Sequence, residues 1–338
     1  MLPRVLFICG SLNQTRQMHK IAQQMPHCEA TYSPYYCDGL VELLRKTGIL
    51  DFTILGWSRR KECLRYLRAN GLPVDHEGKH GPYDLVVTCS DVIVPRNITK
   101  TKVVAVQEGI TDPELFWYWA RRFLPFIPRW TSGTAWTGTS NQYDQMCVAS
   151  EGYRQLFARR GGDASKMVVT GIPNFDNCRE YVSNTFPHKG FVLVCTSDAR
   201  ETLKLDSRKR FLKKALRIAA SRPLVFKLHP NEDWTRAETE IRALAPNALI
   251  YTKGCAEEMV ANCDVLVCQY STLAFVGVAL RKEVHSYYTQ VELDRLLPVQ
   301  HGRAAEEIAR VCKSILEPMP VAVPNQSRLA ERSLGVTA

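Results

Sequence analysis

Residues 5–9 are Val5-Leu6-Phe7-Ile8-Cys9, an unbroken apolar run that is followed at once by Gly10 and Ser11. A run of this length, rich in strand-forming residues and ended by turn residues, is typical of a parallel strand that helices cover on both faces. Comparable runs recur in the first half of the chain, at residues 84–89, 103–106, 146–149 and 167–170. The first half is therefore predicted to be an α/β domain built on a parallel sheet.

The same pattern restarts in the second half of the chain, with runs at residues 191–195, 224–228, 248–251, 265–268 and 284–287. Between the two sets, residues 171–189 carry prolines and asparagines without apolar periodicity, which is typical of a connection between domains. The sequence predicts two doubly wound Rossmann-like domains, at residues 1–182 and 183–318, with a tail at 319–338. A helix over 301–317 is assigned to the second domain. Two such sheets that face each other leave a cleft at the carboxyl ends of their strands.

Composition and charge limit the class of protein. A length of 338 residues fits two domains, and 45% hydrophobic with 23% charged residues is ordinary for a globular protein. The 44 Lys and Arg against 34 Asp and Glu give a net charge of +10, which favours anionic partners. The 12 cysteines lack disulfide or zinc spacing, and no apolar run nears the roughly 18 residues of a membrane span. Because the first residues begin a strand rather than a signal peptide, we expect a protein that is cytoplasmic or lies peripherally on the inner membrane surface.

The first candidate site residue is His229, in Phe226-Lys227-Leu228-His229-Pro230-Asn231-Glu232. Here a buried strand ends in a histidine, and the following proline fixes the turn. The imidazole is predicted to project into the cleft and to donate a hydrogen bond to a phosphate oxygen. The alternative is a histidine in an ordinary turn between strand and loop.

Two further strand ends carry polar residues. Ser271 and Thr272 follow the strand at 265–268 and are predicted to open a helix, where free N–H groups and hydroxyls can seat a phosphate. The alternative is a plain helix N-cap. Glu108 and Gly109 follow the strand at 103–106, which places a carboxylate suited to general-base catalysis beside a glycine that a substrate can approach. The alternative is a surface loop glutamate.

These segments occur in the order of a known group of enzymes. The motifs are Glu108-Gly109, residues 148–153, Gly171-Ile172-Pro173-Asn174-Phe175-Asp176, Lys227-Leu228-His229-Pro230 and Gln269-Tyr270-Ser271-Thr272. From about residue 103 to 290 the chain resembles the GT-B superfamily branch that includes the CDP-glycerol glycerophosphotransferases, bacterial polysialyltransferases and Kdo transferases. Where the glycerophosphotransferases have His-Gly, this chain has Glu108-Gly109, which is similar to the acidic motif of the polysialyltransferases.

The resemblance implies a GT-B fold and a metal-independent transferase without a cofactor. Such an enzyme moves a glycosyl or alditol-phosphate group from a nucleotide-activated donor, here expected to be cytidine-activated, to a cell-surface glycan or a lipid-linked acceptor. The implied catalytic residues are Glu108 and His229. The residues expected at the donor are Thr196, Ser197, Arg200, Lys227, His229, Pro230, Ser271 and Thr272. Those expected at the acceptor are Ser11, Asn13, Thr15 and Gly109.

Two other functions remain open from the sequence. A non-hydrolysing UDP-GlcNAc 2-epimerase shares the GT-B layout but needs several acid and base residues around one sugar. A nucleic-acid-binding protein would fit the net charge, but the basic residues are dispersed and no recognition motif accompanies them. The helix predicted at 207–220, for example, directs Arg208 and its other basic residues to solvent. The His-rich residues 75–80 suggest a solvated turn more than a metal site.

The last feature is the aromatic segment at residues 113–130, which contains Trp117, Trp119, Arg121 and Arg122. Tryptophans mixed with arginines are typical of the boundary between lipid headgroups and acyl chains. The segment predicts peripheral association with an anionic membrane surface. The alternative is a buried helix that contacts the other domain.

Overall fold

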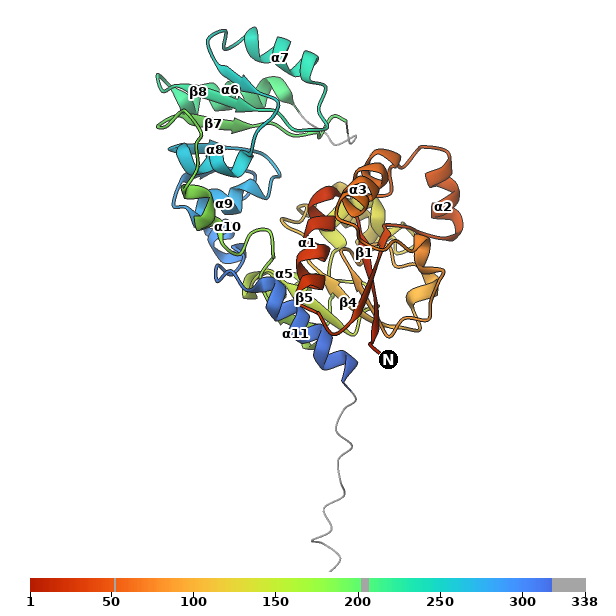
Figure 1. Ribbon diagram of the computed structural model, residues 1–338. Coiled ribbons are helices and arrows are strands. Elements are labelled where there is room, and N and C mark those ends of the chain that lie inside the picture. The colour runs from red at the N-terminus through yellow and green to blue at the C-terminus, as the bar shows by residue number, and fades with distance from the viewer. Residues whose placement is uncertain (52, 202–206, 318–338) are drawn as a thin grey trace, which may run out of the picture.

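The computed structural model describes residues 1–51, 53–201 and 207–317. The first of its two sheets has six parallel strands in the order β2-β1-β3-β4-β5-β6 (Figure 1). Its strands are β1 (Arg4–Cys9), β2 (Glu29–Pro34), β3 (Leu85–Thr88), β4 (Lys102–Val106), β5 (Gln145–Val148) and β6 (Met167–Val169). The order reverses between β1 and β3, which is the point where doubly wound sheets bind ligands.

The second sheet has five parallel strands in the order β11-β10-β7-β8-β9. Its strands are β7 (Val192–Cys195), β8 (Leu224–Lys227), β9 (Leu249–Tyr251), β10 (Val265–Val267) and β11 (Glu283–His285). Here the order reverses between β7 and β10. Both sheets therefore have the doubly wound form that the apolar runs predict, and they lie on either side of residue 182.

Helices connect the strands of each sheet. Those of the first part of the chain are α1 (Leu12–Gln23), α2 (Gly39–Lys46), α3 (Trp57–Ala69), α4 (Phe116–Phe123) and α5 (Glu151–Arg159). Those of the second are α6 (Arg208–Ala219), α7 (Trp234–Arg242), α8 (Ala256–Asn262), α9 (Leu273–Ala279), α10 (Gln290–Leu296) and α11 (Ala304–Leu316). α1 begins at a capping box in which Ser11 and Gln14 each bond the other's backbone N–H, so its start is fixed beside β1.

Strand β2 is the one strand of the described sheets that the apolar runs do not predict. Its sequence EATYSP alternates polar and apolar residues and ends in Pro34. β2 lies at the edge of the sheet, where it pairs with β1 on one side and forms a single bridge from Tyr32 to Val74 on the other. A strand in this position tolerates proline and needs less apolar surface than a central strand. The pattern of a buried parallel strand therefore does not apply to it.

Helix α11 lies against the first domain, not the second domain to which the sequence assigns it. It packs on α1 and β3, and its buried residues Ile308, Ala309 and Cys312 belong to the same apolar core as β1. Before α11, the chain passes close beside α5. The backbone carbonyl oxygen of Arg295 lies 2.0 Å from the position that a Cβ atom would occupy at Gly152, so only glycine fits there. The apolar stripe was predicted correctly, but the stripe does not reveal which domain covers it.

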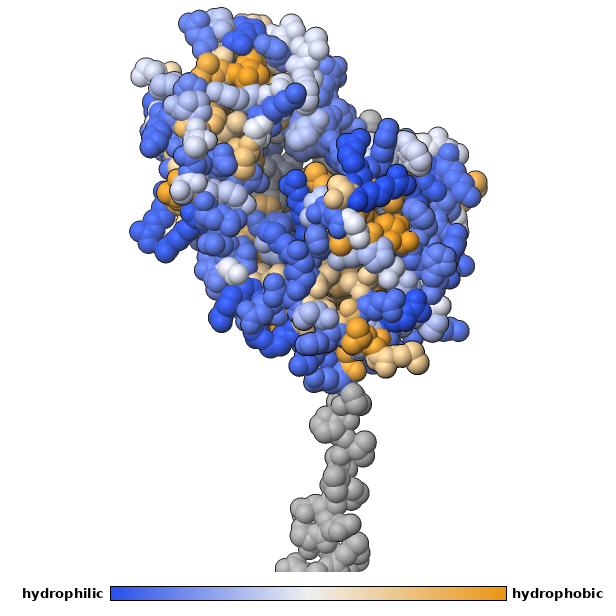
Figure 2. All heavy atoms as spheres, in the orientation of Figure 1, coloured by the Kyte–Doolittle hydropathy of each residue, from blue (hydrophilic) through white to orange (hydrophobic). Residues whose placement is uncertain are grey.

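The apolar core runs through both domains. One cluster joins the first sheet to one face of the second sheet, and a smaller cluster lies on the other face of the second sheet, between Phe226 and helices α6 and α7. The surface is hollowed between the two lobes, and this face is mostly hydrophilic (Figure 2). All 12 cysteines are free thiols, and ten of them are buried. Among the described residues, no helix is long and apolar enough to cross a bilayer.

Candidate functional site

The carboxyl ends of the two sheets meet at a contact between domains. The Thr272 hydroxyl lies 2.6 Å from where a Cβ at Gly109 would stand, and it accepts a hydrogen bond from the Ile110 N–H at 3.4 Å. The Tyr288 hydroxyl donates to the Thr111 carbonyl at 3.0 Å. The loop after β4 is thus held against the second domain directly beyond Glu108.

Glu108 is held by the start of α1. The Ser11 hydroxyl donates to one carboxylate oxygen at 3.3 Å, and the Gln14 side-chain amide donates to the other. Gln14 is itself fixed, because its carbonyl oxygen accepts the Ser11 N–H at 2.6 Å. The carboxylate therefore has a defined orientation at the point where the order of the first sheet reverses.

The protonation of Glu108 is also set by its surroundings. Burial raises the pKa of Glu108 to about 6, although the hydrogen bonds from Ser11 and Gln14 and the positive charge of Arg59 act in the opposite direction. A carboxylate with a pKa near 6 is still ionised at neutral pH and is a stronger base than an ordinary glutamate. This is the property that general-base catalysis requires.

His229 lies in the turn after β8. The Asn231 N–H donates to its Nδ1 at 3.3 Å, and an Asp198 carboxylate oxygen lies 3.5 Å from the same nitrogen. Burial lowers the pKa of His229, and Asp198 opposes this shift. A neutral ring whose Nδ1 accepts a hydrogen bond carries its proton on Nε2, so Nε2–H is the donor that His229 can offer to an anion.

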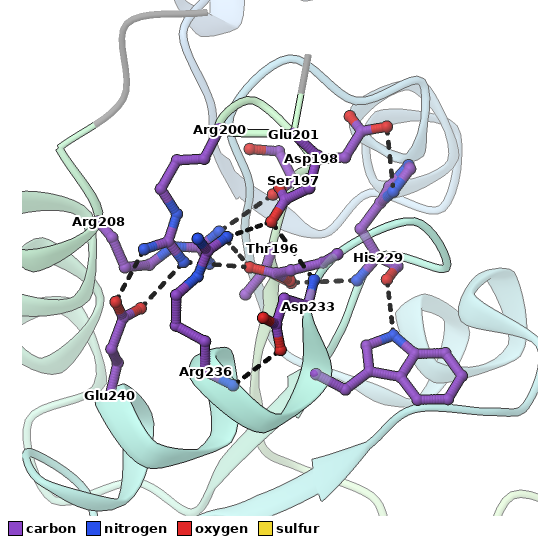
Figure 3. A network of polar contacts seen from close by, with 12 residues as sticks. Thr196, Ser197, Asp198, Arg200, Glu201, Arg208, His229, Asp233, Arg236 and Glu240 are labelled. Carbon is purple, nitrogen blue, oxygen red and sulfur yellow. Dashed lines mark hydrogen bonds and ion pairs between the residues drawn. The ribbon is translucent and has the colours of Figure 1, made fainter. Parts of the chain in front are cut away.

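A buried ion pair supports this turn (Figure 3). The Glu232 carboxylate is fully buried and pairs with Arg208 at the start of α6. Its other oxygen accepts the Thr196 hydroxyl at the end of β7, and Thr196 in turn accepts the His229 N–H at 3.1 Å. Burial raises the pKa of Glu232. The network ties the ends of β7 and β8 together and fixes the backbone of His229.

Arg59 connects the two halves of the site. It extends from α3 of the first domain, donates to the Asn231 side-chain oxygen at 2.8 Å, and lies 3.7 Å from a carboxylate oxygen of Asp198. The same guanidinium acts electrostatically on both Glu108 and His229. The candidate site is therefore a cluster of Glu108, Arg59, Asp198, Asn231 and His229 that spans the two domains.

This arrangement of two doubly wound sheets is shared with solved structures. A Methanocaldococcus jannaschii UDP-GlcNAc 2-epimerase in complex with UDP-GlcNAc and UDP matches with a TM-score of 0.57 at 12% identity, over 92% of this chain and 99% of that one. The S. aureus MnaA–UDP co-structure matches with a TM-score of 0.57 at 11% identity, over 93% and 97%. A wall teichoic acid polymerase TagF structure with CDPG matches with a TM-score of 0.50 at 10% identity, over 93% and 88%.

The chain has the GT-B fold. At these identities the likeness concerns the fold alone. No model of a known protein family matches the sequence. No curated protein matches it at a significant level.

Several residues predicted at the donor side of the GT-B cleft have other contacts. Lys227 is buried and donates to the carbonyls of Leu228 at 2.8 Å and Thr252 at 3.2 Å, and burial lowers the pKa of Lys227. Arg200 makes a bidentate ion pair with Glu240, in which its two Nη atoms lie 2.8 and 3.0 Å from the two carboxylate oxygens. Both cations are thus engaged by groups of the second domain.

The remaining donor-side residues lie at or near the strand ends. The Ser197 hydroxyl donates to Gln269 at 2.8 Å and so links the ends of β7 and β10, where the second sheet reverses. The Ser271 hydroxyl accepts the Leu273 N–H at 3.3 Å, just before α9 begins. Thr272 faces the first domain, as described above, and Pro230 is exposed beside His229.

The predicted acceptor residues make contacts within the protein. Thr15 is fully buried and its hydroxyl donates to the Ser11 carbonyl at 2.8 Å, so it does not reach the loop surface. Asn13 is exposed, and its carbonyl accepts the Asn174 side-chain amide at 2.9 Å. Ser11 orients Glu108. Gly109 allows Thr272 of the facing domain to come close.

Four residues of the site were not predicted from the sequence: three members of the cluster, and Gln14, which orients Glu108. Asp198 and Asn231 lie within two residues of Ser197 and His229, so extending the prediction along each strand-end loop finds them. Gln14 lies in the first turn of α1, and its role depends on a capping box. Arg59 stands in the basic run Ser58-Arg59-Arg60-Lys61, and nothing in that run distinguishes it from its neighbours.

Arg208 corrects the expectation for the helix at 207–220. It points inward to Glu232, because the buried carboxylate needs a cation, whereas the neighbouring basic residues of α6 are exposed as predicted. A separate hollow of about 570 Å³ over this outward face is lined by Ser207, Lys209, Arg210, Lys213, Leu216 and Arg217.

The turn at residues 75–80 is held by Asp75. Its buried carboxylate accepts the N–H groups of Lys79 at 3.0 Å and His80 at 2.8 Å, and the Tyr83 hydroxyl at 2.7 Å. These contacts use the oxygens that a metal would need. In the part of the chain that the structure describes, no three His, Cys, Asp or Glu residues are grouped to hold a metal ion.

Proposed function

We propose that this protein is a metal-independent GT-B transferase. In this proposal it moves a glycosyl or alditol-phosphate group from a cytidine-activated donor to a cell-surface glycan or a lipid-linked acceptor. The observation that carries the proposal is Glu108 after β4, whose carboxylate is fixed by Ser11 and Gln14 and whose pKa is raised to about 6 by burial.

The proposed reaction uses the two halves of the cluster in different roles. Glu108 takes the proton of an acceptor hydroxyl, whose oxygen then bonds to the transferred group as the bond to the nucleotide phosphate breaks. The departing phosphate gains negative charge. The Nε2–H of His229 and the guanidinium of Arg59 stabilise that charge, because preformed donors cost little reorganisation during the reaction. Asn231 orients both donors through its contacts with the Nδ1 of His229 and with the guanidinium of Arg59, and Asp198 lies beside the same guanidinium.

The first test concerns donor binding. His229→Ala is expected to weaken binding of CMP and CDP by about 1.5–3 kcal/mol, or roughly 10- to 150-fold, the typical value of a charge-assisted hydrogen bond. Titration calorimetry measures both affinities. His27→Ala, at an exposed position between α1 and β2, serves as the matched control and is expected to bind like wild type. Unchanged affinity in His229→Ala, or a preference of the wild type for purine nucleotides, contradicts the assignment.

The second test is the dependence of the rate on pH. Because Glu108 must be ionised to accept a proton, kcat/KM is expected to rise with pH through about 6, the pKa of its side chain. The positive charge of Arg59 lowers this pKa, so Arg59→Gln is expected to move the rise to higher pH. Arg68→Gln, at the exposed far end of α3, is the control. If kcat/KM rises at the same pH in Arg59→Gln as in the wild type, Arg59 does not act electrostatically on Glu108.

An epimerase is distinguished by a single incubation. A UDP-GlcNAc 2-epimerase converts its substrate without a second reactant, whereas a transferase needs an acceptor. Incubation with UDP-GlcNAc alone, followed by separation of the two epimers, is expected to give no conversion. Steady turnover in that experiment replaces the transferase proposal with the epimerase.

A further inference from the structure

The aromatic segment at residues 113–130 is exposed at most of its large apolar side chains, although Tyr118 within it is buried. Seven large apolar side chains in and around α4 face solvent, and we call them the aromatic patch: Leu115, Phe116, Trp117, Trp119, Phe123, Leu124 and Phe126. Phe123 and Phe126 are 76% and 80% exposed. Soluble proteins rarely leave so many large apolar side chains together in water, so such a patch marks a surface that contacts something else.

The inner side of α4 is firmly packed. Tyr118 is buried and stacks on Trp136 with ring centroids 4.7 Å apart. The Arg121 guanidinium lies over the same Trp136 ring at 5.3 Å and donates to the Pro125 carbonyl at 2.9 Å. The helix is therefore held in place by one face, and the apolar side chains on its other face are presented in a fixed arrangement.

The charged side chains within the segment of the aromatic patch are all positive. The charged residues between 115 and 126 are Arg121 and Arg122, and Arg122 is exposed and lies over the Trp119 ring at 5.9 Å. The nearest acidic residue in sequence, Glu114, is neutralised by Arg160 at 3.0 Å. A surface of aromatic rings and guanidinium groups is complementary to a bilayer with anionic headgroups, where rings enter the boundary and arginines bind phosphates.

We propose that the aromatic patch docks this protein on an anionic lipid bilayer. The rings of Phe123, Phe126 and Trp117 enter the boundary between headgroups and acyl chains, and Arg122 contacts lipid phosphate. The net charge of +10 adds a long-range attraction to the same surface. This inference does not rest on the proposed transferase activity, because lipid binding requires neither donor nor acceptor.

The position of the patch connects it to the candidate site. Leu115 lies seven residues after Glu108, so even a fully extended chain places them within about 25 Å of each other. Thr111, between them, contacts Tyr288 of the facing domain. A docked molecule thus holds the Glu108 side of the cleft near the membrane surface. The acceptor class that suits this placement is one with a lipid anchor and a polar head.

The test is flotation of the full chain with lipid vesicles, which needs no substrate. Binding is expected to vesicles of phosphatidylcholine with phosphatidylglycerol, to be weak on phosphatidylcholine alone, and to fall with salt as the screening length shortens from about 30 Å at 0.01 M to about 3 Å at 1 M. Phe123→Ser plus Phe126→Ser is expected to lower binding by at least about tenfold, because it removes two of the most exposed rings.

The matched control is Leu40→Ser plus Val291→Ser, which removes two apolar side chains that are 71% and 78% exposed outside the patch. This control is expected to float like wild type, and thermal melting checks that both variants fold. Failure of the wild type to float at low salt overturns the proposal, as does an equal loss in the control. If the wild type is instead a dimer by light scattering and the patch variant a monomer, a second copy of the chain covers the patch and the lipid proposal is wrong.

Discussion

Glu108→Gln is expected to slow transfer by about 100-fold or more while donor affinity changes little. Glutamine keeps the shape of the side chain and can still bond Ser11, but it cannot accept a proton from an acceptor hydroxyl. The loss therefore falls on the chemical step and not on donor binding. Single-turnover rates with an identified acceptor, together with calorimetry of the donor nucleotide, separate the two effects.

Glu151→Gln makes the same chemical change at an exposed position in the first turn of α5 and is expected to react like wild type. If Glu108→Gln retains near-normal turnover, Glu108 is a structural residue that holds the start of α1. A loss of donor affinity with unchanged chemistry would instead place Glu108 at the donor. The acid limb of the pH profile is expected to disappear in Glu108→Gln, which a purely structural role does not predict.

Glu232→Gln is expected to destabilise the second domain by about 3–5 kcal/mol, the usual cost of removing one partner of a buried ion pair. The side chain of Glu232 is fully buried and that of Arg208 is 4% exposed, so the guanidinium loses its counter-charge in a site that water does not reach. Urea denaturation followed by circular dichroism measures the change. His229 should also lose its fixed backbone, because Thr196 bonds both groups.

Glu240→Gln is the matched control for this prediction. Glu240 pairs with Arg200 at 2.8 Å, but 34% of its side chain is exposed, so the change is expected to cost less than about 1 kcal/mol. Replacing both buried partners, by Glu232→Leu plus Arg208→Met, should recover much of the stability. If Glu232→Gln and Glu240→Gln lower the free energy of unfolding equally, burial of the Glu232–Arg208 pair does not raise the cost of removing one partner.

Much of the fold could be predicted from the sequence because parallel strands leave a strong local signal. The apolar runs at 5–9 and 191–195, and those that follow each of them, correspond to strands within one or two residues. β2 was not predicted, because an edge strand needs no continuous apolar run. α11 was found as a helix but assigned to the wrong domain, because an apolar stripe records that a face is buried and not which element buries it.

The site could be predicted only where chemistry follows a strand directly. Glu108 and His229 stand at strand ends, and both lie in the interdomain cluster. Lys227 and Arg200 have the expected residue types, but their cations are engaged inside the second domain, which spacing does not reveal. Arg59 could not be predicted, since its role depends on α3 of one domain approaching a loop of the other.

The return of α11 to the first domain means that the chain passes between the domains twice, at residues 170–191 and at 286–303. A body tethered to another at one point can swivel in every direction, whereas two tethers leave rotation about the line that joins them as the easiest motion. The expected hinge axis between the two domains therefore runs along the contact between α5 and α10. Such a rotation changes the separation of Arg59 from Asn231 and Asp198, while α5 and α10 stay in contact.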